Sequence, residues 1–294
     1  MELKTTFKEQ VISEIITRRE NFSGSDSKYA KSLDLSPSVY SRLKNGESHQ
    51  LISDSLILQI ARKLNIQTSS NTWKLVKTSV YQQLESNLNF CKQHTESMIL
   101  IDDCGIGKSA CSRHIVQGMH DSFYIDCSQA KTKQRFVRYI AKVVGINDTG
   151  RYHDVKENLK YYINAVLVNP LFVLDDVGYL DYSAFLEIPE LWNSTEDRCS
   201  WYMIGDESLK KTFERSIENQ KKGFRAIKSR FLDEYISFTP KGEDKRSFLS
   251  ELYQDVAYAN VKDKSKVNKI VKMTLAEDSR LRYLKKIVKI NNNI

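Results

Sequence analysis

The sequence predicts an α/β fold with a parallel sheet, because short apolar runs alternate with amphipathic helical stretches through the middle of the chain. Two of these runs, 99–101 and 171–174, each end in a pair of aspartates. The first pair is followed closely by the turn 105–109, Gly-Ile-Gly-Lys-Ser. A buried strand, a glycine-rich turn and a helix in this order indicate a phosphate-binding loop.

The residue types in this loop fit phosphate chemistry. Glycines let backbone N–H groups surround a polyphosphate, and the helix expected over 110–119 would add the partial positive charge of its N-terminus. Lys108 can reach the terminal phosphates, and the Ser109 hydroxyl can ligate Mg²⁺. The full pattern G-x-x-x-x-G-K-[ST] has a glycine where this chain has Asp102, so a chance Gly-x-Gly-Lys-Ser on a surface turn is the alternative.

The second acidic strand end supplies the partner that a phosphate loop requires. A carboxylate in the position of Asp175 holds the hydration shell of Mg²⁺, and its neighbour Asp176 polarises the attacking water. A third apolar run ends in Gly205-Asp206. We expect strands at 99–101, 122–127, 171–174, 200–205 and 235–238, with helices at 132–144 and 155–168 between them.

The length of 294 residues is too great for one small domain, so we expect two or three folded units. A polar stretch without periodicity, 67–74, is predicted to be a linker that leads to a helix over 73–91. The predicted units are a helical domain at 1–66, an α/β core at 75–240, and a helical region at 241–294 with helices at 242–259, 263–275 and 279–290.

The charge of the chain is concentrated at its two ends. The formal net charge is +8, of which residues 1–90 carry +3 and residues 241–294 carry +6, while the middle carries −1. Basic ends around a neutral centre favour a polyanionic partner, with solvated helical faces as the alternative.

The sequence shows no sign of a membrane or an export signal. No apolar run approaches the roughly 18 residues of a membrane span, and the first 14 residues lack an apolar signal core. The five cysteines are scattered without a Cys-x-x-Cys pair, which is typical of buried, reduced thiols. We therefore expect a cytoplasmic protein without a membrane partner.

The stretch 26–44 predicts two short helices joined by a tight turn. Ser36 is a favoured helix N-cap, and Pro37 occupies the first helical position. With flanking helices at 7–19 and 51–66, this pattern resembles the helix-turn-helix of lambda-repressor-like domains. A helical docking or oligomerisation module is the alternative. In the resemblance the second helix enters the major groove, and the residues that would contact DNA are Ser38, Ser41, Arg42 and Lys44.

Residues 75–290 together resemble an AAA+ ATPase, with a phosphate loop, an acidic strand end, a polar tip on the third strand, a Ser-Arg-Phe sequence and a helical lid. A helix-turn-helix in front of such a core is similar to the MuB-type ATPases of DNA transposition, whose relatives include IstB and TnsC. Segments such as IDDCGIGKS, FYIDCSQAKTKQ and WYMIGDESL carry this likeness. Function is argued from the site and not from the fold.

The resemblance implies ATP and Mg²⁺ as cofactors. It assigns Ser109 and Asp175 to the metal, and Asp176, Lys108 and Arg230 to catalysis, with Arg230 as an arginine finger that completes a neighbouring subunit's site. Arg282 is implied to be the arginine of the helical lid that senses the terminal phosphate. Arg225 is the alternative to Arg230 as the finger, and Arg280 is the alternative to Arg282 in the lid. The residues implied to contact nucleotide are Gly105, Ile106, Gly107, Lys108, Ser109, Ala110, Asp206 and Arg282.

The implied function is assembly with ATP into a ring or helical filament on double-stranded DNA, which selects target DNA and recruits or stimulates a transposase. Lys131, Lys133 and Arg151 are implied to contact the enclosed DNA. Asp102, Asp176 and Asp206 depart from the family pattern, so we expect slow hydrolysis that drives disassembly. The alternatives are a helicase loader or replication initiator, and a DNA-binding regulator with a nucleotide switch that does not hydrolyse.

Overall fold

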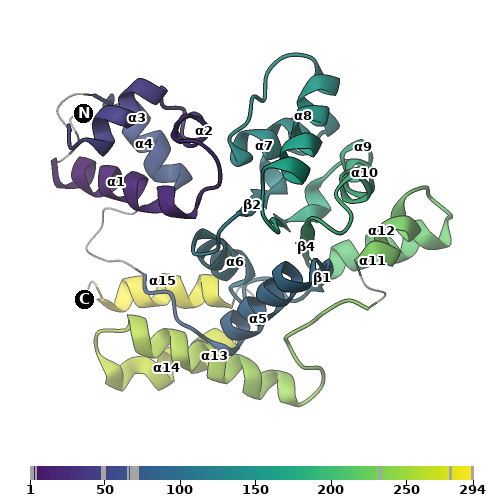
Figure 1. Ribbon diagram of the computed structural model, residues 1–294. Helices are drawn as coiled ribbons and strands as arrows, with labels where there is room; N and C mark the ends of the chain where they lie inside the picture. Colours follow the sequence, from purple (N-terminus) through teal and green to yellow (C-terminus); the bar gives the residue numbers. More distant parts are fainter. Residues whose placement is uncertain are drawn as a thin grey trace.

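The computed structural model describes residues 3, 5–47, 51–64, 66, 73–231, 234–277 and 280–292. Its centre is a four-stranded parallel sheet in the order β1-β4-β3-β2 (Figure 1). The predicted α/β class with a parallel sheet is confirmed. The strands are β1 (Met98–Ile101), β2 (Ser122–Asp126), β3 (Leu171–Asp175) and β4 (Ser200–Gly205).

Helices cover both faces of the sheet, which explains why its strands read as continuous apolar runs. Successive side chains point to opposite faces, so Trp201 and Met203 enter one core while Tyr202 and Ile204 enter the other. The first core is closed by α7 (Lys133–Val144), α8 (Tyr152–Ala165), α9 (Tyr182–Phe185), α10 (Glu187–Ser194), α11 (Glu207–Glu218) and α12 (Phe224–Arg230). The second is closed by α5 (Ser79–His94), α6 (Lys108–Gln117), α13 (Asp244–Asn260), α14 (Val267–Leu275) and α15 (Leu281–Asn292).

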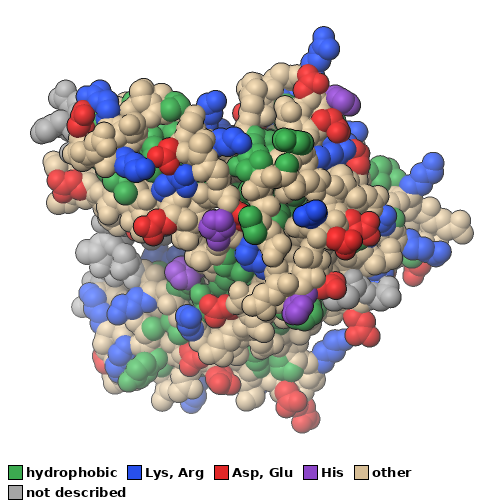
Figure 2. Space-filling model, viewed as in Figure 1, with side chains coloured by type: hydrophobic (Ala, Val, Ile, Leu, Met, Phe, Trp, Pro, Cys, Tyr) green, Lys and Arg blue, Asp and Glu red, His purple; other side chains and the backbone are tan. Residues whose placement is uncertain are grey.

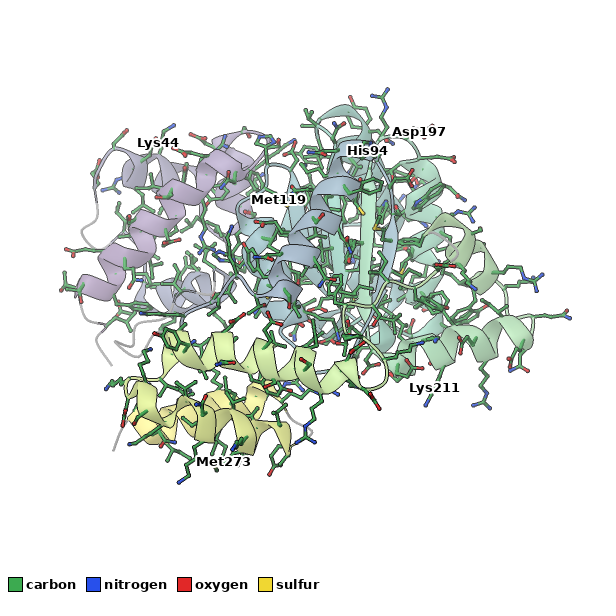
Figure 3. The ribbon with its side chains drawn as sticks, turned by 90° about the horizontal axis from the view of Figure 1, so that it is seen from below. Lys44, His94, Met119, Asp197, Lys211 and Met273 are labelled. Carbon is green, nitrogen blue, oxygen red and sulfur yellow. The ribbon has the colours of Figure 1, made fainter. Side chains whose placement is uncertain are left out.

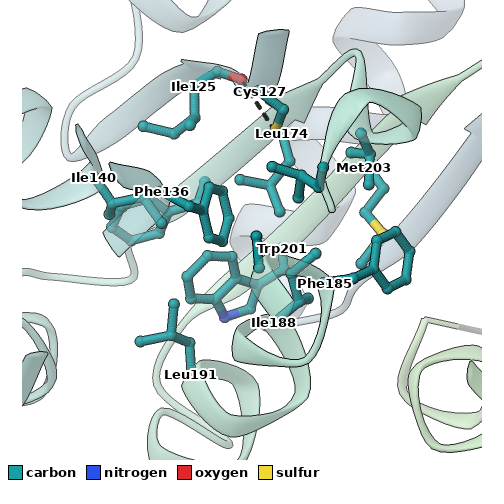
Figure 4. Packing of buried hydrophobic residues seen from close by; sticks show 14 of the residues in the cluster. Ile125, Cys127, Phe136, Ile140, Leu174, Phe185, Ile188, Leu191, Trp201 and Met203 are labelled. Atoms are coloured by element: carbon teal, nitrogen blue, oxygen red, sulfur yellow. Dashed lines mark hydrogen bonds between the residues drawn. The ribbon is translucent and has the colours of Figure 1, made fainter. Parts of the chain in front are cut away.

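An aromatic stack forms the middle of the first core. Trp201 lies 4.7 Å from Phe172 between ring centroids, and Phe172 lies 5.0 Å from Phe123. The indole N–H of Trp201 donates to Thr195 Oγ1 at 3.2 Å, so the buried ring leaves no polar atom unsatisfied. Figure 4 shows Phe136 and Ile140 of α7 packed beside this tryptophan.

The strand expected at 235–238 is wrong in extent. Only Ile236 pairs with β1, through a parallel bridge to Leu100 and two backbone hydrogen bonds of 2.9 Å. The backbone N–H groups of Phe238 and Thr239 donate to the carboxylate of Asp102 at 2.6 and 3.0 Å, so they are not available to continue a ladder. A side chain at the end of β1 therefore ends the pairing at this edge.

The expected helix over 73–91 is also wrong at its start. Residues 73–78 are not helical, and α5 begins after Thr78, whose hydroxyl accepts from the N–H of Tyr81 at 3.4 Å. The predicted linker 67–74 lies mostly outside the described residues. The domain limits remain predictions.

The N-terminal helices form a core of their own. They are α1 (Thr5–Thr17), α2 (Asp26–Ser32), α3 (Pro37–Lys44) and α4 (Asp54–Lys63), and their apolar side chains form a separate cluster. Ser36 caps α3 as expected, accepting from the N–H of Val39 at 3.2 Å. The unit contacts the sheet domain where Tyr162 donates to the carbonyl of Ser23 at 3.2 Å. None of the described helices is both long and apolar enough to span a membrane.

Asp102→Ala tests whether this carboxylate stabilises the edge of the sheet. The change leaves two buried N–H groups without an acceptor, so the free energy of unfolding of the α/β domain should fall by about 2 kcal/mol. Trp73, Trp192 and Trp201 are the three tryptophans of the chain and all lie beyond residue 72, so their fluorescence during urea unfolding reports on this domain. The exposed Glu218→Ala is the control and should stay within about 0.5 kcal/mol. Equal urea midpoints for the two variants would contradict the role of Asp102.

Candidate functional site

A cavity of about 540 Å³ opens at the carboxyl ends of β1, β3 and β4. The phosphate loop, the segment 73–78 and the C-terminal helices form its other walls. Every residue that the sequence suggested for nucleotide or metal lines it. These residues are Gly105, Ile106, Gly107, Lys108, Ser109, Ala110, Asp175, Asp176, Asp206 and Arg282.

The phosphate loop depends on glycine at two positions. Gly105 has φ 78° and Gly107 has φ 104°, both in the left-handed region that other residues rarely adopt. Gly107 is also the N-cap of α6, so the first N–H groups of that helix belong to the loop. The helix N-terminus and the loop N–H groups together form an anion-binding corner.

Lys108 is the clearest sign that the cavity is suited to an anion. Its side chain is only 9 % exposed, and its Nζ donates to the carbonyls of Asp102 and Asp103 at 2.6 and 2.8 Å. Burial lowers the pKa of Lys108. Within the described part of the chain no carboxylate forms an ion pair with it. A buried ammonium held only by neutral carbonyls fits a site for phosphate.

Asp102, which stands where the loop pattern has a glycine, is turned to a different task. It is 5 % exposed, and its carboxylate binds the N–H groups of Phe238 and Thr239. It does not contribute to the wall of the cavity. The side chain therefore does not obstruct the space in which phosphates would lie.

The two carboxylates at the end of β3 have different surroundings. Asp175 is 2 % exposed and accepts hydrogen bonds on both oxygens, from Tyr124 Oη and from the N–H of Asp176 at 3.0 Å. Asp176 has φ 55° and is exposed at the cavity. Loss of solvent around its carboxylate and the charge of Asp175 raise the pKa of Asp176, which makes it a stronger proton acceptor.

Asp206 caps α11 while it lines the cavity. Its carboxylate accepts from the N–H groups of Ser208 and Leu209 at 3.0 and 3.4 Å, and from Cys104 Sγ at 3.2 Å. Burial opposes ionisation, but the hydrogen bonds from Ser208 and Cys104 hold the pKa of Asp206 below its usual value. Cys104 is exposed, so the expectation that all five cysteines are buried is wrong at this position.

The two candidate lid arginines do different things. Arg282 lines the cavity. Arg280 instead lies 2.9 Å from the carboxylate of Asp103 and donates to the carbonyl of Cys104 at 3.2 Å. Lys245 also pairs with Asp103, at 2.7 Å. The geometry therefore favours Arg282 as the residue that meets a ligand, with Arg280 as an anchor between loop and C-terminal helices.

Three parts of the site were not anticipated from the sequence. The segment 73–78 brings Trp73, Leu75 and Val76 to the cavity, where they form an apolar wall suited to a flat ring. Tyr124 binds Asp175, and Arg113 donates to Tyr124 Oη at 3.1 Å. The signal available for the segment 73–78 was its apolar Trp-x-Leu-Val run directly after a polar stretch. No local sequence pattern indicated the roles of Tyr124 and Arg113.

The residues present fit a magnesium ion that arrives with its nucleotide. No three His, Cys, Asp or Glu side chains gather into a metal site within the ranges that the structure describes. Mg²⁺ keeps several waters and needs one or two protein ligands beside substrate phosphates. Asp175 and Ser109, which line the same cavity, satisfy that requirement.

The arginines proposed as fingers lie away from this cavity. Arg230 ends α12, donates to Asn193 Oδ1 at 2.7 Å and lies 5.4 Å from the ring centroid of Trp192. Arg225 is exposed on the same helix. Neither residue lines the cavity of its own chain.

The residues suggested for DNA fall into two separate groups. Lys131, Lys133 and Arg151 are exposed near α7 and α8, and the Lys133 ammonium pairs with buried Glu187 at 3.0 Å. The other four are exposed on α3, where Arg42 pairs with Glu47 at 2.8 Å and Lys44 with Asp26 at 3.0 Å. The four on α3 are Ser38, Ser41, Arg42 and Lys44.

Comparison with known proteins gives the fold its context. Residues 91–213 match a family model described as an AAA domain. No curated protein sequence matches the chain. The Orc1 protein of Aeropyrum pernix, solved in complex with DNA, is similar with 17 % identity and a TM-score of 0.55, over 77 % of this chain and 62 % of that one.

Cdc6p from Pyrobaculum aerophilum is similar with 14 % identity and a TM-score of 0.51, over 76 % of this chain and 63 % of that one. The ORC2 protein of Aeropyrum pernix, in ADPNP-ADP complexes, is similar with 12 % identity and a TM-score of 0.50, over 76 % of this chain and 64 % of that one. This chain thus spans less than two-thirds of each of these structures, and the likeness concerns the fold. The phosphate loop, Asp175, Asp176 and Asp206 of the cavity thus lie within the stretch that matches an AAA domain, and the chain has a fold similar to that of these proteins.

Proposed function

We propose that this chain is an ATPase that binds Mg²⁺ and ATP, assembles with copies of itself on double-stranded DNA, and serves DNA transposition. The observation that carries the proposal is the single cavity that joins a glycine-rich loop, the buried ammonium of Lys108 and the acid pair Asp175-Asp176. A nucleoside triphosphate with its metal is the ligand that uses all of these groups.

Each polar group in the cavity then has a role toward the nucleotide. Lys108 leaves the two loop carbonyls and pairs with phosphate oxygens, which offers it a charged partner in place of neutral ones. Ser109 and Asp175 would hold the metal, which would supply positive charge beside the phosphates when bound. Asp176 orients the attacking water and Arg282 contacts the terminal phosphate, while Asp206 is the polar residue that faces the nucleotide after β4. The loop residues Gly105, Ile106, Gly107 and Ala110 form the cradle.

Self-assembly is supported by the position of the finger candidates. An arginine finger supplied to another subunit has to lie outside the cavity of its own chain. Arg230 meets this condition, and its contacts with Asn193 and Trp192 hold it at the surface end of α12. Hydrolysis would then require an oligomer.

DNA binding is supported by the exposed face of α3. Its ion pairs to Glu47 and Asp26 are exposed and therefore cost little to exchange for phosphates. Figure 2 shows basic and acidic side chains mixed over the visible face of the N-terminal helices, and the proposed contact is limited to α3. Lys131, Lys133 and Arg151 are the proposed contacts to DNA enclosed by the oligomer.

Transposition is proposed because a small helical unit precedes the ATPase core, in the arrangement that resembles MuB-type proteins. The partner would then be a transposase, and hydrolysis would release the assembly from DNA in the cytoplasm. A replication initiator or helicase loader is the second candidate, favoured by the likeness of the fold to Orc1 and Cdc6p. Capture of a transposase or of a replicative helicase from a reconstituted mixture would decide between the two. A regulator that binds ATP without hydrolysis is the third, because Asp176 stands where Glu is usual.

Lys108→Ala should abolish assembly on DNA, because assembly requires the bound triphosphate. Electron microscopy of the wild-type chain with duplex DNA and a non-hydrolysable ATP analogue should show DNA-filled rings or filaments, and the variant should show none. The exposed Lys211→Ala, on α11, should assemble like the wild type. Assemblies of Lys108→Ala equal to those of the wild type would refute the role of the nucleotide.

Arg230→Ala should keep ATP binding and lower hydrolysis by about 10³-fold, the size of effect seen for arginine fingers. Arg225→Ala, on the same helix, is the matched comparison and should hydrolyse at nearly the wild-type rate. Phosphate release with DNA present measures both. If Arg225→Ala loses hydrolysis and Arg230→Ala keeps it, Arg225 is the finger.

Arg42→Gln should weaken binding to duplex DNA and make the affinity less dependent on salt. Loss of one phosphate contact reduces the slope of log K against log salt concentration by about 0.9. Fluorescence anisotropy of a labelled duplex gives both values. Lys211→Gln is the control, since Figure 3 places Lys211 on the opposite side of the molecule from Lys44 of α3. Identical slopes for the wild type and Arg42→Gln would show that α3 does not contact the DNA backbone.

A further inference from the structure

The buried carboxylate of Asp175 is held by a relay of two side chains from different elements. Tyr124 of β2 donates its hydroxyl hydrogen to Asp175 Oδ2, and Arg113 of α6 donates to Tyr124 Oη at 3.1 Å. The guanidinium carbon of Arg113 also lies 4.8 Å from the centroid of the tyrosine ring. Neither residue lines the cavity, so both act on it through Asp175.

The direction of this relay is fixed by chemistry. Arginine has only donors, so the oxygen of Tyr124 must accept from Arg113. The one hydroxyl hydrogen of the tyrosine is then committed to Asp175.

The relay follows from the register of the sheet and the pitch of α6. Tyr124 pairs with Val173, two residues before Asp175 on β3, so the three side chains share one face of the sheet. The long tyrosine side chain spans that diagonal step. Arg113 follows Ser109 by four residues, so both lie on the same face of α6. Helix α6 thus carries the proposed metal ligand Ser109 and also, through Arg113 and Tyr124, holds the other proposed ligand, Asp175.

We propose that Tyr124, backed by Arg113, is a positioning residue for the magnesium site. With Oδ2 bound by the tyrosine and Oδ1 by the N–H of Asp176, the carboxylate cannot rotate, and one lone pair on each oxygen remains for water on the metal. This inference rests on the proposed binding of Mg²⁺ with ATP. Partners that orient metal ligands in this way commonly change metal affinity by 10- to 100-fold when they are removed.

The test is Tyr124→Phe, which removes only the hydroxyl. Binding of a fluorescent ATP analogue is measured in excess EDTA and then at increasing Mg²⁺, with no hydrolysis required. The Mg²⁺ concentration that gives half of the gain in affinity should rise about tenfold. Affinity in EDTA should stay within about twofold of the wild type, because the loop and its lysine are unchanged.

Tyr202→Phe is the matched control. Tyr202 is fully buried on β4, packs in the same core as Tyr124, and its hydroxyl binds Asn87 at 3.3 Å and not an acid. Its removal should leave the Mg²⁺ requirement unchanged even if it lowers stability. If Tyr124 served only to fill the core, Tyr124→Phe would leave the Mg²⁺ requirement unchanged, as Tyr202→Phe does.

The outcomes separate the relay from the wider proposal. If the wild type gains no affinity from Mg²⁺, the proposed metal–nucleotide site is wrong and this inference falls with it. If the wild type responds and Tyr124→Phe responds at the same Mg²⁺ concentration, only the positioning role is refuted. Should Tyr124→Phe fail to fold by circular dichroism, Arg113→Gln, which keeps the tyrosine, should shift the Mg²⁺ requirement in the same direction. An unchanged requirement in that variant would refute the relay equally.

Discussion

The parallel pairing of β1, β4 and β3 is the constraint on which the candidate site depends. Parallel strands end at a common edge, and here Ile101 pairs with Gly205 while Leu174 pairs with Met203. The loop after β1, the acids after β3 and the polar residue after β4 therefore converge. A shift of one residue in the pairing register of a strand would turn each of its side chains to the opposite face of the sheet. The packing of the two apolar cores thus fixes which side chains at the strand ends face the cavity, and core residues such as Ile106 and Ile204 also form part of its wall.

The features predicted correctly from the sequence are those with local causes. Apolar runs that end in acids marked the strand ends, glycine pairs marked the loop, and Ser36-Pro37 marked the start of α3. The features that were missed depend on residues far apart in the chain. The fifth strand shrinks to one bridge because Asp102 captures N–H groups 136 and 137 residues away. No periodicity or propensity at either position carries that information.

The same distinction applies within the site. The residues that the sequence suggested for phosphate and metal all line the cavity, because phosphate and metal chemistry limits the residue types and their spacing. The sequence did not identify Tyr124 and Arg113, since any polar side chain of suitable reach could orient Asp175. It also gave no sign that Asp102, which departs from the loop pattern, would bind the backbone of residues 238 and 239. Residues that act on ligands leave sequence patterns, whereas residues that act on other residues need the structure.

An ion pair with Asp103 connects one end of α13 to the phosphate loop. Lys245 attaches the first turn of this 17-residue helix to the phosphate loop, and Asn260 at its last turn exchanges hydrogen bonds of 2.7 and 3.0 Å with the backbone of Lys74. The helix is about 25 Å long, so a rotation of roughly 5° at Asp103 would displace its far end by about 2 Å. A small adjustment of the loop around a ligand would thereby be larger at Lys74, beside the cavity, than at the loop itself.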